Sequence, residues 1–395
     1  MNYLTANGTI RIDRCVWWYG GGEPSDGRVD QWLGIADSSV SLGSRELCCL
    51  MAMDCSFVKA SGKLKQVGQI DVSVERLRTI VEGEGVAMLA TRSAGLLSPD
   101  WSSSECRPNL SEPLSPSNPS CVLVGGDGVM IPVITAAEKA RRRAGRRHVR
   151  RRGVKRRRVR RHRGADQGWK EFKIGQFYSP DKSRCWVFAT QGNHEEFGRQ
   201  LRRESFKIHM EQADRVASIT DCAVWLGRQM QRRLPKLNEK ILDFYHVAEH
   251  VAATSASCWG LETSESKAWT GHVLHQAKHK GAVAVLEEIL IAERTLCGRT
   301  SNAGLSKRVA RTALAELKGY VGKRVEMMDY PRFIAEGYDI GSGPTEAKCK
   351  TVPHRLKGSG MRWNQPNAEA MAALACTEQS NMLPTYWALQ RQQLT

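Results

Sequence analysis

The chain has 395 residues, 41% of them hydrophobic, which is enough for two or three domains with apolar cores and excludes a wholly disordered protein. A membrane helix needs about 18 consecutive apolar residues, and no such run occurs, so we expect no membrane span. The twelve cysteines lack CxxC spacing and follow no signal-peptide pattern, which indicates reduced thiols and a cytoplasmic protein. Of the formal charge of +18, residues 139–163 carry 16 Lys or Arg and no acid. The remainder of the chain is therefore close to neutral.

The first 96 residues divide into two predicted parts. In residues 1–40, apolar and polar residues alternate briefly before a Gly/Pro cluster, which predicts a short hairpin and a turn. In residues 41–96, apolar residues recur at helical spacing, and Ser73 is suited to cap the second of two short helices. This pattern predicts a helix-turn-helix domain that offers Arg76 and Arg78 to DNA. Helical pairs of this kind also occur in domains that bind no DNA.

Residues 97–120 predict a linker, because they hold five prolines and many serines without a period. After this linker, the first predicted elements are strands. A helix is expected at 194–210, and apolar runs predict strands at 121–134, 169–178, 184–192, 215–221 and 240–245. This order predicts an α/β fold with an RNase H-like mixed sheet.

The predicted catalytic domain is split in two by an all-helical insertion. Its first part is 121–246, the insertion is 247–330, and its last part is 331–395, with a final helix around residues 368–376. Residues 139–163 interrupt the first hairpin, and we expect a disordered Arg-rich loop that binds DNA phosphates without reading sequence.

Two aspartates in the predicted strands are candidate site residues. Asp127 lies inside the first strand, where a carboxylate is costly to bury without a partner, although the surrounding glycines also fit a β-bulge or turn. Asp221 ends the fourth strand and could equally cap the next helix. In an RNase H-like order these two strands are neighbours, so both carboxylates would lie at one edge of the sheet.

Glu346 is a third acidic candidate, alone among Lys and Arg residues. It could be an ordinary first-turn residue that pairs with Lys350 four positions on. A helix packed across the sheet would instead bring it to Asp127 and Asp221. Three such carboxylates repel each other unless cations intervene, and hard oxygen ligands suit two Mg²⁺ or Mn²⁺ ions. This site would catalyse two-metal phosphoryl transfer.

Several motifs carry a resemblance to a known family. They are "GGDGVM", "ITDCAVWL", "LDFYHVAEH", "YDIGSGPTEAKCK", "RLKGSGMRW" and "NAEAM", spread between residues 121 and 387. Together they resemble bacterial insertion-sequence DDE transposases of the ISKra type. The resemblance implies that Asp127, Asp221 and Glu346 are the catalytic metal ligands. It also implies a nucleoid-associated homo-oligomer that acts on double-stranded DNA.

The resemblance also implies a D-x-x-H motif, which Asp243 and His246 fit. We interpret these two as residues that position the site or the DNA, with Asp243 as second metal ligand the alternative. The family has a Cys-pair zinc ribbon near the N-terminus, whereas residues 1–40 contain a single cysteine, Cys15, and a single thiol cannot hold structural zinc.

Further residues are candidates for DNA contact. Trp259 and Trp269 in the insertion could stack on a base or could belong to its core. Five cations surround Glu346 and are expected to bind substrate phosphates: Lys348, Lys350, Arg355, Lys357 and Arg362.

The expected function is metal-dependent cleavage and transfer of DNA strands at insertion-sequence ends. Two alternatives remain open. One is an inactive transposase remnant that only binds DNA, which the incomplete cysteine set favours. The other is an RNase H-like nuclease without strand transfer, which would share the same site.

Overall fold

The computed structural model describes residues 2–11, 39–108, 119–137, 139–141, 144, 167–298, 304–358 and 361–392. The Arg-rich segment at 139–163 lies outside the described residues, apart from residues 139–141 and 144. The predicted turn, with Cys15, also lies outside them.

The N-terminal part begins with a small hairpin and continues with three helices. The elements are β1 (Asn2–Thr5), β2 (Gly8–Arg11), α2 (Leu42–Asp54), α3 (Phe57–Gly68) and α4 (Val74–Ser93). The two predicted helices are thus confirmed, and the Ser73 side chain caps α4 by accepting from the backbone N–H of Arg76. The first part of the predicted linker packs against the core after α4, because Leu97, Trp101 and Cys106 are buried.

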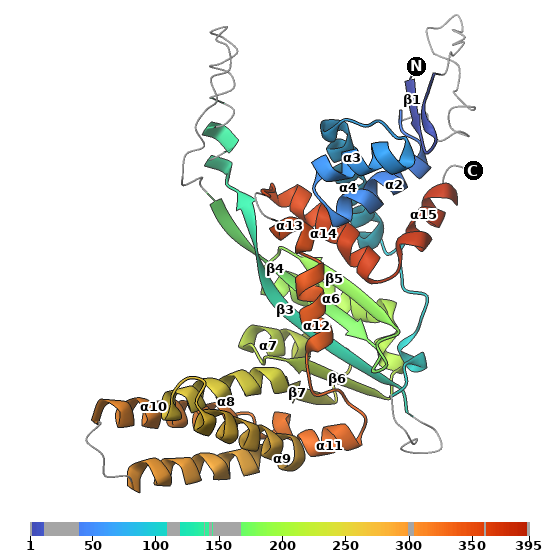
Figure 1. The fold of residues 1–395 in the computed structure, drawn as a ribbon. Helices are drawn as coiled ribbons and strands as arrows, with labels where there is room; N and C mark the ends of the chain where they lie inside the picture. Colours follow the sequence, from blue (N-terminus) through green and yellow to red (C-terminus); the bar gives the residue numbers. More distant parts are fainter. Residues whose placement is uncertain are drawn as a thin grey trace, which may run out of the picture.

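A mixed five-stranded sheet forms the centre of the molecule (Figure 1). Its strands are β3 (Cys121–Ile134), β4 (Gln167–Tyr178), β5 (Cys185–Thr190), β6 (Arg215–Thr220) and β7 (Glu239–Leu242). In space they follow the order β5-β4-β3-β6-β7. The pairs β3–β4 and β4–β5 are antiparallel, whereas β6 is parallel to both β3 and β7.

The five predicted strands and the neighbourhood of the first and fourth are confirmed, and several predicted ends are shifted by one to three residues. The last strand stops at Leu242, because Asp243 caps the next helix and residues 244 and 245 are already helical. The helix after β5 ends at Lys207, before His209 takes a left-handed backbone conformation. The final helix is longer than predicted, and the short helix after it was not predicted at all.

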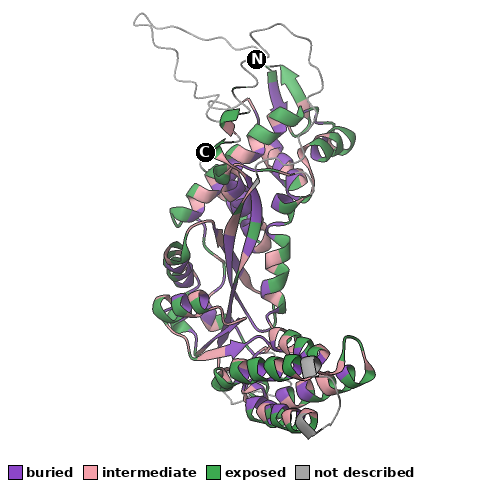
Figure 2. Ribbon diagram, turned by 90° about the vertical axis from the view of Figure 1, so that its left-hand side faces the viewer, coloured by how far each residue is buried: buried purple, intermediate pink, exposed green. Residues whose placement is uncertain are grey.

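Helices cover both faces of the sheet, and further helices pack beyond its two ends (Figures 1 and 2). The helices that follow β5 and β6 are α6 (His194–Lys207) and α7 (Val224–Arg233). Those between β7 and the C-terminal part are α8 (Phe244–Trp259), α9 (Ser264–Gly298), α10 (Gly304–Gly322) and α11 (Tyr330–Ala335). The C-terminal part holds α12 (Gly343–Thr351), α13 (His354–Lys357), α14 (Gln365–Gln379) and α15 (Leu383–Gln392).

One hydrophobic core joins the N-terminal helices to the sheet. Leu77 and Val81 of α4 belong to the same buried cluster as Phe172 of β4 and Trp387 of α15. Burial of roughly 25 cal/mol per Å² of apolar surface drives this packing. The helices α2–α4 therefore do not form a separate core of their own.

A second hydrophobic core lies where α8, α9 and α10 pack against β6 and β7. Ile219 and Ile241, on β6 and β7, belong to the same buried cluster as Val251 of α8 and Leu317 of α10. Trp259 and Trp269, whose ring centroids are 5.0 Å apart, pack against this cluster. Their position favours the core interpretation of both tryptophans.

The packing of α4 on α14 gives a testable prediction of stability. An added Cβ at Gly85 would lie 2.7 Å from the carbonyl oxygen of Ala370, so Gly85→Ala should lower the free energy of unfolding by about 1–3 kcal/mol through overpacking. Gly83→Ala on the same helix is the matched control, because its Cβ would meet nothing within 4 Å. It should raise that free energy by up to about 1 kcal/mol through helix propensity. Urea denaturation followed by circular dichroism measures both, and equal shifts would contradict the close approach.

Candidate active site

Asp127 lies in the middle of β3 with its side chain exposed. The backbone N–H of Gly128 donates to its Oδ1 over 2.6 Å. Pairing with β4 runs without interruption through Gly126, Asp127 and Gly128, so the bulge interpretation is wrong. The glycines serve close packing instead, since a Cβ at Gly126 would meet Leu226 and Phe197 at 3.3–3.4 Å.

Asp221 lies beside Asp127 because β6 runs parallel to β3. Val124 pairs with Ser218; Asp127 comes three residues later on β3, and Asp221 comes three residues later, directly after the end of β6. The Oδ1 of Asp221 accepts from the backbone N–H of Ala223 at 2.9 Å, and Ala223 is the residue that precedes α7. This contact agrees with the alternative that Asp221 caps the next helix. The carboxylate nevertheless lies at the edge of the sheet.

Glu346 reaches the same region because α12 packs directly on β3. A Cβ at Gly125 would lie 1.8 Å from the Oγ1 of Thr345, so only glycine permits this approach. The side chain of Gln176 on β4 donates from Nε2 to the same Oγ1 over 2.9 Å. Glu346 is the next residue of α12, and its exposed carboxylate pairs with Lys350 at 3.3 Å, as the simpler interpretation predicted.

Asp127 is close enough to the other carboxylates to be affected by their charge. The pKa of Asp127 is raised above its ordinary value first by desolvation and then by the negative charges of Asp221, Glu171 and Glu346, while the Gly128 N–H lowers it. Residues 94 and 125 positions apart in the sequence thus form one acidic cluster. Sequence reasoning missed Glu171, although a charged residue inside the β4 strand pattern was a visible signal.

The carboxylates of the acidic cluster are the candidate ligands for divalent cations. In the described ranges of the chain, no three His, Cys, Asp or Glu side chains converge closely enough to hold a metal ion. Asp127, Asp221 and Glu346 each bind a local partner, namely Gly128, Ala223 and Lys350. Carboxylate oxygens are hard ligands of the type that Mg²⁺ and Mn²⁺ prefer, so the chemistry of the donor set fits these ions.

Asp243 connects the strand β7 to the loop before α12. Its side chain is 4% exposed, and its Oδ1 accepts from the backbone N–H groups of Tyr245 at 3.3 Å and Ser342 at 2.8 Å. Ser342 immediately precedes α12, so Asp243 fixes the start of the helix that carries Glu346. These contacts favour the positioning role over the alternative of a metal ligand.

His246 lies one turn further along α8 in a cluster of rings. Its Nδ1 is 3.4 Å from the carboxylate of Glu249, and its ring meets that of His250 edge-on at 4.8 Å. His250 in turn stacks on Tyr320 of α10 at 4.0 Å. The pKa of His250 is lowered by burial and by the neighbouring charges of His246 and Arg324. His246 thus joins α8 to the helical bundle.

The five cations predicted to bind phosphates differ in their environments. Lys348 donates to the side chain of Gln379 over 3.0 Å, and Lys350 pairs with Glu346. Lys357 and Arg362 are exposed, as a phosphate contact requires.

Arg355 is the exception, and the prediction for it is wrong. It is 6% exposed, its Nε donates to the carbonyl of Ala52 over 2.9 Å, and its guanidinium lies over the rings of Phe57 and Trp363. Burial of this cation holds α13 against the N-terminal helices, so it offers nothing to a phosphate.

The two arginines of the predicted helix-turn-helix both have protein partners. Arg76 is half-buried and donates to Ser39 through its Nη2. Arg78 is exposed and pairs with Glu75 on the same helix. Their contact with DNA stays a prediction.

No protein-family model matches the chain, and a search of the curated proteins found no match either. Within the described residues, every helix is too short or too polar to cross a membrane.

The acidic cluster predicts a stability that depends on pH. Without divalent cations, Asp127→Asn should raise the melting temperature near pH 7, because the amide keeps an acceptor for Gly128 and removes a repelled charge. The pKa of Asp127 in the folded protein lies above its ordinary 3.8, so the folded state binds a proton more tightly than the unfolded state does. The contribution of Asp127 to the free energy of unfolding is therefore highest below pH 3.8 and falls as the pH rises through the folded-state pKa. Thermal denaturation in EDTA should therefore show a larger gap in melting temperature between variant and wild type at pH 7 than at about pH 4. A constant gap would contradict the acidic environment.

Proposed function

We propose that this chain is a DNA transposase that cleaves DNA strands at the ends of a mobile element and joins them to target DNA. The observation that carries the proposal is the placement of Asp127 on β3 and Asp221 after β6 on neighbouring parallel strands, with the helix that carries Glu346 packed on β3 at Gly125. Carboxylates can hold the metal ions that assist phosphoryl transfer.

The topology of the sheet supports an RNase H-like catalytic domain. The order β5-β4-β3-β6-β7, with the first three strands antiparallel and the last two parallel to β3, is the order that the proposal requires. The helices α8–α11 separate β7 from α12 in the sequence, as an insertion between the second aspartate and the glutamate would. Both features agree with the motifs that resemble ISKra-type transposases.

Each residue of the site has a distinct proposed role. Asp127, Asp221 and Glu346 would hold two Mg²⁺ or Mn²⁺ ions, with Glu346 exchanging its ion pair with Lys350 for this task. When bound, such ions lower the pKa of the attacking water or 3'-hydroxyl and stabilise the leaving oxygen. Asp243 holds the start of α12 through the Ser342 N–H, and the exposed Lys357 and Arg362 would contact the phosphates of the substrate strand.

The substrate proposed is double-stranded DNA, at transposon ends and at the target, in the bacterial nucleoid. The proposal includes a homo-oligomer, in which each copy would act on one end of the element. The local positive charge of residues 139–163 supports a sequence-independent affinity for DNA.

The first functional prediction concerns the carboxylates. Glu346→Gln and Asp221→Asn should each abolish Mg²⁺-dependent strand cleavage while DNA binding persists, because the amide keeps the shape but loses the charge that holds a cation. Asp243→Asn should retain cleavage, since its side-chain oxygen can still accept from Ser342 and Tyr245. A nicking assay on supercoiled DNA compares the three variants. An active Asp221→Asn beside an inactive Asp243→Asn would instead make Asp243 the metal ligand.

The products of the same reaction distinguish the alternatives. Joined DNA products in the presence of target DNA support a transposase. Cleavage without joining supports an RNase H-like nuclease, and DNA binding without cleavage supports an inactive remnant.

The second functional prediction concerns residues 139–163. Ile134 pairs directly with Gln167, so the chain leaves β3 and enters β4 at adjacent positions, and a short Gly/Ser turn can replace the segment. The replacement should weaken binding equally for specific and random duplexes and should flatten the dependence of affinity on salt, because phosphate contacts carry no base information. Fluorescence anisotropy across a salt series measures both. Selective loss of binding to one sequence would show that the segment reads bases.

A further inference from the structure

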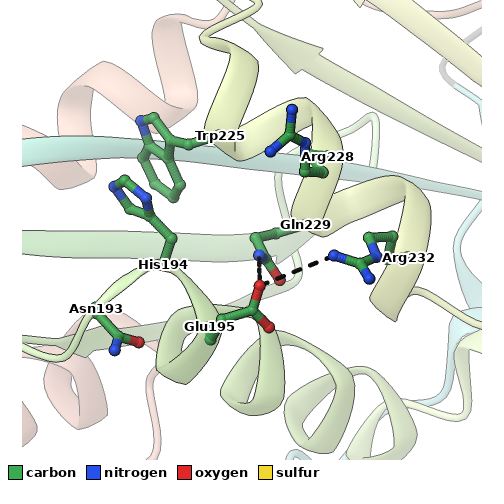
Figure 3. Close-up of a pocket in the computed structure, with 7 residues that line it drawn as sticks. All are labelled: Asn193, His194, Glu195, Trp225, Arg228, Gln229 and Arg232. Atoms are coloured by element: carbon green, nitrogen blue, oxygen red, sulfur yellow. Dashed lines mark hydrogen bonds and ion pairs between the residues drawn. The ribbon is translucent and has the colours of Figure 1, made fainter.

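A pocket of about 250 Å³ lies between the start of α6 and the outer side of α7 (Figure 3). Its walls include one stacked ring pair and several polar or charged side chains: His194, Glu195, Trp225, Arg228, Gln229 and Arg232. None of these residues belongs to the acidic cluster or to the cations considered above. The role of the pocket is therefore a separate question.

The rings of His194 and Trp225 form a stack that is open to solvent. Their centroids are 4.7 Å apart and their planes differ by 13°. Phe197 meets Trp225 edge-on at 5.4 Å from the core side, which holds the indole in place. His194 is exposed at the first position of α6. An aromatic ligand can extend this stack by lying on the imidazole.

The charge around the stack is positive. Glu195 is already occupied, because it accepts from Gln229 at 2.9 Å and from Arg233 at 2.6 Å, and Arg232 lies 3.9 Å away. Arg228 is exposed and has no ion pair or hydrogen bond among the residues that the structure describes. An exposed arginine beside a ring stack is suited to a phosphate that is attached to a flat aromatic group.

The pocket is a close neighbour of the acidic cluster. Asp221 and Trp225 are separated by one turn of chain at the start of α7. Lys173 is 4% exposed, lies 5.7 Å from the Trp225 ring, and pairs with Glu171 at 2.6 Å. Glu171 is one of the charges that raise the pKa of Asp127. Gly125 faces α12 and Gly126 faces α6 and α7, so Asp127 and the pocket lie on opposite faces of the sheet.

We infer that this pocket binds an unpaired nucleotide of a DNA strand. Its base stacks on the His194–Trp225 pair and its phosphate binds Arg228. The inference rests on the proposed function for the identity of the polymer. A base in a duplex has no free face for such a stack, so the site selects single-stranded or locally opened DNA. The volume falls below the roughly 300–1,000 Å³ of pockets that enclose small molecules, which favours one base of a polymer over a free metabolite.

The test compares the affinity of the full-length protein for two DNA probes. One is a fluorescein-labelled single-stranded oligonucleotide, and the other is the same sequence fully paired. In EDTA, His194→Ala should weaken binding to the single strand about tenfold and leave binding to the duplex within about twofold. Arg228→Ala should lower the salt slope for the single strand by about 0.7, the value expected for one lost phosphate contact. Fluorescence anisotropy across a salt series gives both quantities.

Arg199→Ala is the matched control, because Arg199 is an exposed arginine of α6 that pairs with Glu196 and does not line the pocket. It should leave the single-strand affinity and the salt slope close to those of wild type. The inference is overturned if Arg228→Ala matches this control, if His194→Ala weakens both probes equally, or if the single strand does not bind.

Because the measurement uses no divalent cation, it is independent of cleavage. An inactive protein that still shows the selective loss with His194→Ala would refute the proposed transposase activity and keep the pocket. An active protein without that loss would refute the pocket alone.

Discussion

The contact between α12 and β3 at Gly125 is the constraint on which the candidate site depends. Thr345 occupies the space that any side chain at position 125 would need, and Gln176 binds its hydroxyl from the next strand. Asp243 holds the preceding loop through the Ser342 N–H. Buried hydrogen bonds of this kind are costly to break, since an unsatisfied group loses its hydration without compensation. They set the position at which Glu346 meets the aspartates.

Local partners offset the repulsion among the three carboxylates. Asp127, Asp221 and Glu346 each have a nearby N–H group or ammonium, while water still reaches all three side chains. Partial exposure screens the repulsion that full burial would amplify. The arrangement is thus stable as folded and retains carboxylate oxygens that can turn toward a common ligand.

Buried polar contacts bind the N-terminal helices to the sheet. The guanidinium of Arg92, at the end of α4, donates to the Val187 carbonyl on β5 and to Thr377 on α14, and it lies 4.4 Å from the Trp186 ring centroid. The Trp186 indole N–H in turn donates to the buried Glu204 of α6. A helix held by such contacts cannot move independently of the sheet. DNA bound at α4 would therefore have a defined orientation relative to the acidic cluster.

The sequence by itself predicted most of the local elements and singled out Asp127, Asp221 and Glu346 as candidates for one site. Hydrophobic period, glycines and Ser73 predicted the helices and strands, because these signals act over a few neighbouring residues. The buried role of Arg355, the fourth carboxylate Glu171 and the pocket at Trp225 were decided only by tertiary structure. Each depends on residues far apart in the chain, such as Arg355 with Ala52, or Glu171 with Asp127. Burial and electrostatic environment are properties of these long-range contacts, and a one-dimensional pattern does not contain them.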